Sequence, residues 1–182
     1  VDPLDDQRCL VYFRPNQIYF LLTAAKIEAL REAGELDRAQ WLVASTWPTS
    51  RSIGEIAERT SERGPARLTT FRVPVGFKHF AALVSDLEDQ IAAGAQTCTA
   101  TDVTGTEADL GPRPRVLIMA EESGGAALGT REPVASRDGA RTSLAPKEKD
   151  AMQIGVLALC LAARLHGEDR SWARYYLDLL GD

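Results

Sequence analysis

The sequence predicts one α+β domain over residues 1–182, mostly helical, with a small sheet and a long mobile loop. Three observations support this fold class. Several segments carry apolar residues at helical spacing, and shorter runs are rich in β-branched and aromatic residues. The chain has 182 residues, of which 45% are hydrophobic, and this is enough material for one buried core.

Six helices are predicted from apolar periodicity and from residues that cap or stop a helix. Asn16 is the expected cap of the first helix, and Ser52 with Glu55 forms an expected capping box on the third. The second helix is expected to direct Trp41, Leu42 and Trp47 inward. The predicted ranges are 17–33, 36–46, 52–60, 77–93, 147–166 and 171–180.

Three strands are predicted over 8–15, 67–76 and 115–120, where β-branched or apolar residues cluster. Pro74 places the end of the second strand at a sheet edge or at a bulge, because proline cannot donate to the strand ladder. The helix over 147–166 is apolar on nearly every side, which predicts that it is buried. With the helix that follows, it forms a predicted C-terminal helical pair over 147–180.

The segment 121–146, which begins "EESGGAALG", raises the question of a ligand site. Its glycines, Gly124, Gly125 and Gly129, follow a predicted strand, as phosphate-binding glycines do. Their spacing matches neither GxGxxG nor GxxxxGK[ST], however, and the segment is long and polar. We therefore expect a mobile loop, which its arginines allow to become ordered on an anionic partner.

Composition and motifs argue against a disulfide-rich, secreted, membrane-spanning or metal-binding protein. The net charge is −5, and three cysteines without a CxxC pair favour a cytoplasmic protein with reduced thiols. Residues 1–8 lack the pattern of a signal peptide, and the apolar run over 151–163 is too short to span a membrane. The two histidines, His79 and His166, have no second ligand at helical spacing, so no metal or cofactor is expected.

Catalytic residues are not assigned by any motif. There is no GxSxG, and only the neighbouring Glu121 and Glu122 stand where acid–base chemistry is conceivable. The leading hypothesis is therefore a binding or assembly protein that acts through protein partners or copies of itself. An enzyme of unrecognised class is the third alternative. The predicted contact residues form an aromatic stripe on the last helix, which serves either a partner interface or the closure of the protein's own core: Trp172, Tyr175, Tyr176 and Leu179.

The second alternative is nucleic-acid binding. The stretch "RSIGEIAERTSERGPARLTTFRVPVGF" resembles the middle of a winged helix-turn-helix, and "IGEIAERT" is similar to the second helix of that family. The resemblance implies a regulator that binds DNA through residues 51–78, although no recognition helix follows the expected short turn. Arginines of this stretch and of the 121–146 loop are the candidate contacts: Arg51, Arg59, Arg63, Arg67, Arg131, Arg137 and Arg141.

Overall fold

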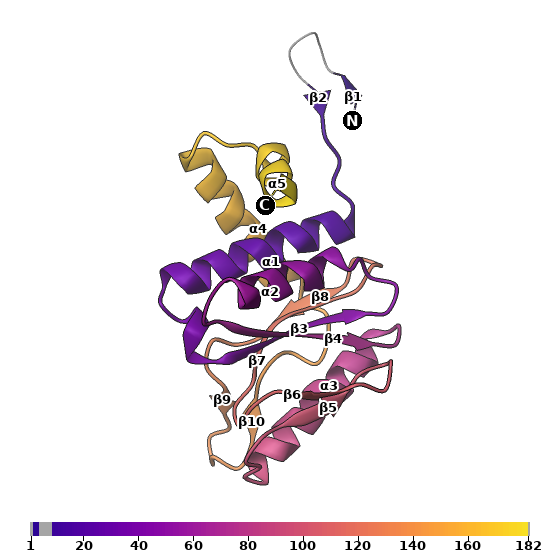
Figure 1. Ribbon diagram of the computed structural model, residues 1–182, viewed down its shortest axis with the longest axis vertical. Coiled ribbons are helices and arrows are strands. Elements are labelled where there is room, and N and C mark those ends of the chain that lie inside the picture. The colour runs from indigo at the N-terminus through magenta and orange to yellow at the C-terminus, as the bar shows by residue number, and fades with distance from the viewer. Residues whose placement is uncertain (1, 4–8, 182) are drawn as a thin grey trace.

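The computed structural model describes residues 2–3 and 9–181, and these form an α+β domain around a four-stranded sheet (Figure 1). The predicted fold class is therefore confirmed. In the sheet, β3 (Gln40–Thr46) lies between β4 (Arg67–Val73) and β7 (Arg115–Ala120) and is parallel to both. The fourth strand, β8 (Ala126–Leu128), pairs antiparallel with β7 at one edge.

Helices cover both faces of this sheet. Figure 1 shows α1 and α2 on one face, α3 with the β5–β6 hairpin on the other, and α4 with α5 beyond α1. The helices are α1 (Pro15–Glu32), α2 (Ser52–Glu62), α3 (Phe77–Ala92), α4 (Ala151–Gly167) and α5 (Trp172–Gly181). Short hairpins complete the chain: β1 (Asp2–Pro3) with β2 (Cys9–Leu10), β5 (Thr99–Thr101) with β6 (Glu107–Asp109), and β9 (Val134–Ala135) with β10 (Thr142–Ser143).

The predicted helix over 36–46 is wrong. A short 3₁₀ turn over Leu36–Arg38 is followed by β3, the central strand of the sheet. Trp41 and Val43 point into one hydrophobic cluster, whereas Leu42 points into the other. A strand that is buried on both faces reads as a continuous apolar run, so its two-residue period is invisible in the sequence. Trp47 lies beyond the strand and is 53% exposed, instead of facing inward.

The other predicted helices are present. α2 and α3 begin where predicted, whereas α1, α4 and α5 begin at Pro15, Ala151 and Trp172. Pro15 occupies the first position of α1, where its missing N–H costs nothing. Asn16 is therefore not the cap, and its Oδ1 accepts a hydrogen bond from the backbone N–H of Ser50 at 3.3 Å. The N-cap of α2 is Arg51, so the capping box expected from Ser52 is not formed.

Two of the predicted strands are confirmed as β4 and β7, and β4 is an edge strand as Pro74 indicates. The predicted strand over 8–15 is reduced to β2, and α1 begins already at Pro15. The start of that predicted range, Arg8, lies outside the described residues.

The segment 121–146 is not structureless, because it contains β8, β9 and β10. Ala126 to Leu128 are buried in the main sheet, and Leu144 is buried against α3. Two glycines have packing roles. A Cβ on Gly129 would overlap the carbonyl oxygen of Val116, and a Cβ on Gly125 would overlap Glu121 Oε1. Without a side chain, Gly129 can lie against the backbone of β7 and Gly125 can lie against the side chains of Glu121 and Lys149. These contacts explain both glycines without a ligand.

We predict opposite effects for two glycine-to-alanine substitutions. Gly129→Ala forces the backbone of β7 to move and is expected to destabilise the protein by about 1–3 kcal/mol. Gly155 lies inside α4, with open space around an added Cβ. Gly155→Ala is therefore expected to stabilise the protein by about 0.5–1 kcal/mol. Urea unfolding at low protein concentration measures both. Equal stability of the two variants would contradict the packing role of Gly129.

Hydrogen exchange is expected to divide the segment 121–146. Amides of Ala126 to Leu128 should exchange about a hundredfold or more slowly than those of Arg137 to Ala140, because β8 is buried and the hairpin tip is exposed. The predicted mobility of the segment would then be restricted to the part around β9 and β10. Uniformly fast exchange from residue 121 to residue 146 would instead restore the prediction of one mobile loop.

Candidate functional site

The predicted contact residues on α5 pack inward against the N-terminal part of the chain. Tyr175 is only 3% exposed. The ring of Tyr176 lies 5.8 Å from that of Phe13 and 5.9 Å from that of Phe20, both in edge-on geometry. Trp172 and Leu179 are partly buried against the same core. The aromatic stripe therefore closes the protein's own core, and the outward side chains of α5 are Leu177 and Leu180.

The structure does not gather the predicted arginines into one surface. Arg51 follows the carboxyl end of β3, whereas Arg67 begins β4 at the amino end, so roughly 20 Å of strand separates them. Arg131 forms an ion pair with Glu35 at 2.7 Å. Arg59 and Arg63 line a cavity of about 500 Å³ between α1 and α2. Arg137 and Arg141 are exposed around the β9–β10 hairpin.

The resemblance to a winged helix-turn-helix does not extend to the structure. α2 leads directly into β4, which is parallel to β3, so α2 is the crossover helix of a β-α-β unit. Ile53 and Ala57 are fully buried against the sheet and α1, as core positions of such a helix are. The next helix, α3, lies on the opposite face of the sheet and cannot pack with α2 as a recognition helix does (Figure 1).

Glu121 is buried and forms an ion pair with Lys149, whose side chain is exposed. Glu121 is 3% exposed, and Lys149 Nζ lies 2.7 Å from its Oε1, although the geometry leaves this oxygen without a well-aligned hydrogen bond. The Tyr19 hydroxyl donates to the carbonyl oxygen of Gly124 in the same turn. Burial and the charge of Glu121 raise the pKa of Tyr19. The ion pair with Lys149 thus gives Glu121 a structural role.

Glu122 has a different set of partners. Its Oε2 accepts a hydrogen bond from Thr46 Oγ1 at 2.6 Å and a longer one from Thr49 Oγ1 at 3.4 Å. These contacts join the carboxyl ends of β3 and β7. The two neighbouring glutamates therefore occupy separate networks, so their geometry does not favour a shared acid–base role.

Helix α4 contacts the sheet edge along one side. The backbone N–H of Asp150 donates to Ala126 O at 2.9 Å, and Gln153 Oε1 accepts from the backbone N–H of Leu128 at 3.1 Å. These bonds satisfy polar groups of β8, the edge strand. Asp150 also caps α4, because its side chain accepts from the amides of Met152 and Gln153, so the helix begins at Ala151 rather than at 147.

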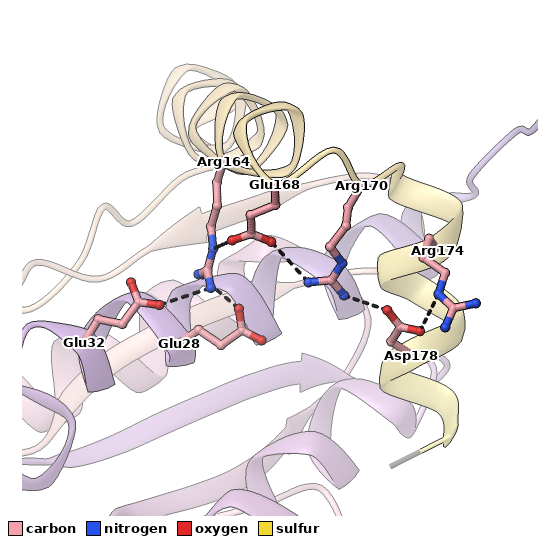
Figure 2. Close-up of polar contacts among 7 residues, drawn as sticks. All are labelled: Glu28, Glu32, Arg164, Glu168, Arg170, Arg174 and Asp178. Atoms are coloured by element: carbon pink, nitrogen blue, oxygen red, sulfur yellow. Dashed lines mark hydrogen bonds and ion pairs between the residues drawn. The ribbon is translucent and has the colours of Figure 1, made fainter.

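A charged network fixes α4 and α5 to α1 (Figure 2). Arg164 contacts Glu28 and Glu32 on α1, each at 3.1 Å, and Glu168 at 2.9 Å. Arg170 continues the network to Asp178 on α5 at 2.7 Å. A network of this kind sets orientation more than it adds stability, because its members are partly exposed.

The side of α4 opposite these contacts is apolar and exposed. The prediction that this helix is buried is therefore wrong for most of its length, since only Leu161 and Leu165 are fully buried. We define the outer face of α4 as six exposed residues at helical spacing: Met152, Gly155, Val156, Leu159, Cys160 and Ala163. Met152 is 80% exposed and Leu159 71%. A contiguous exposed apolar face of this kind marks an interaction site more often than scattered apolar residues do.

A groove of about 460 Å³ runs between α4 and the end of β8, and Lys26 of α1 lines it. Lys26 donates a hydrogen bond to Gly129 O at 3.3 Å. Burial lowers its pKa to about 8. The sequence analysis missed this residue, although Lys26 is the only charged side chain between residues 15 and 27.

No protein-family model matches the chain, and no similar curated protein was found. Within residues 2–3 and 9–181, no three histidine, cysteine, aspartate or glutamate side chains are grouped so that they could hold a metal ion. None of the helices described by the structure is both long and apolar enough to cross a membrane.

The lowered pKa of Lys26 predicts how stability depends on pH. Between pH 8 and 10.5 the unfolded chain binds this proton more tightly than the folded protein, so stability rises with pH in that window. Lys26→Met removes the cost of burying the charge and is expected to stabilise the protein at pH 7 by about 2 kcal/mol. Urea unfolding at pH 7 and pH 10 tests this. If the variant is less stable at pH 7, the buried ammonium has a compensating partner.

Proposed function

We propose that the protein is a non-catalytic assembly protein that binds a second copy of itself through the outer face of α4. The observation that carries the proposal is the exposure of apolar side chains along one face of a helix that holds no charged residue from 151 to 163. The positions follow the i, i+3, i+4, i+7 spacing of helices that pack on another element. Burial of these side chains against a partner removes apolar surface from water.

The shape of the face suits helix packing. Val156 and Leu159 project from its middle, and the small residues Gly155 and Ala163 lie beside them. Small residues let a second helix approach closely, while the larger side chains fill the spaces between. Such a face is complementary to itself when two copies are related by a two-fold axis.

The helix dipole favours a second copy in antiparallel orientation. In an antiparallel pair the N-terminal end of each helix meets the C-terminal end of the other, so the helix dipoles oppose each other. A parallel pair would place like ends together.

The alternative functions stay predictions. Nucleic-acid binding rests on arginines that lie on separate elements, and the enzyme alternative rests on two glutamates with separate partners. A cytoplasmic location likewise remains a prediction from the sparse cysteines.

Charge substitution on α4 tests the proposal. We expect wild-type protein to sediment as a dimer at micromolar concentration. Leu159→Glu is expected to sediment as a monomer, because the desolvation free energy of an unpaired carboxylate opposes its burial in the interface. Leu177→Glu is the matched control, since Leu177 is 60% exposed on α5 outside the outer face of α4. Circular dichroism confirms that both variants are folded. A monomeric wild type, or equal sedimentation of all three proteins, contradicts self-association through α4.

A further inference from the structure

Lys26 is a cation whose surroundings give it little compensation. Its ammonium has one hydrogen bond, a 3.3 Å contact to the backbone carbonyl of Gly129. In the part of the chain that the structure describes, no carboxylate lies within ion-pair distance of it. Lys26 is partly buried, and an ammonium withdrawn from water is normally paired, because its desolvation costs more than a single neutral hydrogen bond returns. The site therefore favours an anion from outside the chain.

The other polar groups of the groove already have partners. Asp150 caps α4 through two backbone amides, and Gln153 Oε1 accepts from Leu128. The remaining lining is apolar, with Leu128 on the sheet side and Val156 and Leu157 on α4. Lys26 is thus the one cationic group of the lining, and it lacks an ion-pair partner among the described residues.

We infer that this groove binds a small amphiphilic carboxylate, with the carboxylate at Lys26 Nζ and the aliphatic chain along α4. The apolar stretch from Met152 to Cys160 is about 12 Å long at the rise of an α-helix, which suits a chain of medium length. The volume of about 460 Å³ lies within the range of small-molecule sites. A lysine offers a single point charge, which is sufficient for a monovalent carboxylate.

This inference does not rest on self-association. Lys26 and Leu128 lie outside the outer face of α4, whereas Leu159 does not line the groove. The two surfaces share Met152, Val156 and Cys160, so a bound chain and a second copy are expected to compete for these side chains. Ligand binding is best measured in both wild type and Leu159→Glu, where the groove residues are unchanged.

Decanoate is the probe, and decanol is its neutral counterpart. Isothermal titration at pH 7 is expected to show saturable decanoate binding that Lys26→Met weakens about tenfold or more, because a charge-assisted contact is lost. Lys78→Met, which changes an exposed lysine of α3, is the matched control and should bind as wild type does. Decanol should bind more weakly than decanoate, and equally to all proteins.

Three outcomes would overturn the inference. The first is decanoate binding that Lys26→Met leaves unchanged, which would place the carboxylate elsewhere. The second is binding of decanol as tight as that of decanoate, which would show nonspecific apolar adsorption. The third is the absence of decanoate binding in both wild type and the monomeric Leu159→Glu variant. Binding to Leu159→Glu alone supports the site and shows that the second copy covers it in the wild type.

Discussion

The burial of β3 on both faces is the constraint on which the rest of the structure depends. Its backbone is hydrogen-bonded to β4 on one side and to β7 on the other, so the strand has no free edge. Its side chains alternate between two hydrophobic clusters. Both faces of the sheet must therefore be covered, and the chain meets this need with α1 and α2 on one face and α3 on the other.

The far edge of the sheet explains the position of α4. β8 is short and would expose unpaired backbone groups, and α4 satisfies two of them through Asp150 and Gln153. The charged network from Arg164 then fixes the helix against α1. With its sheet-facing side held in this way, the opposite side is turned to solvent, although it is apolar. The exposed apolar face thus arises from the same contacts that protect the sheet edge.

The sequence predicts helices whose two sides differ in polarity, and it predicts a strand where an apolar run is short and isolated. α2 and α3 have clear apolar faces, and the strand over 115–120 is a compact apolar run, so their types are correct. β3 was assigned to a helix because a strand with two buried faces shows no alternation. The "IGEIAERT" segment is a helix as expected, but the sequence cannot tell a crossover helix from one that packs in a helix-turn-helix.

The candidate site was harder to predict, because it depends on contacts between distant residues. The apolar composition of α4 predicts burial, and composition does not reveal that part of this surface stays exposed. The groove joins β8 and α4 to Lys26 of α1, which precedes Leu128 by 102 positions in the chain. The aromatic stripe of α5 has the spacing of a contact surface, and the same spacing serves a helix that packs on Phe13 and Phe20.

The most direct test of the account is methyl NMR of the two methionines, Met119 and Met152. Met119 is buried beside the central strand, and Met152 is 80% exposed on the outer face of α4. With a soluble paramagnetic agent present, we expect the Met152 signal to be broadened at low protein concentration and to become protected as concentration rises. Met119 should stay protected throughout. A Met152 signal that remains equally accessible at all concentrations would contradict an outer face covered by a second copy.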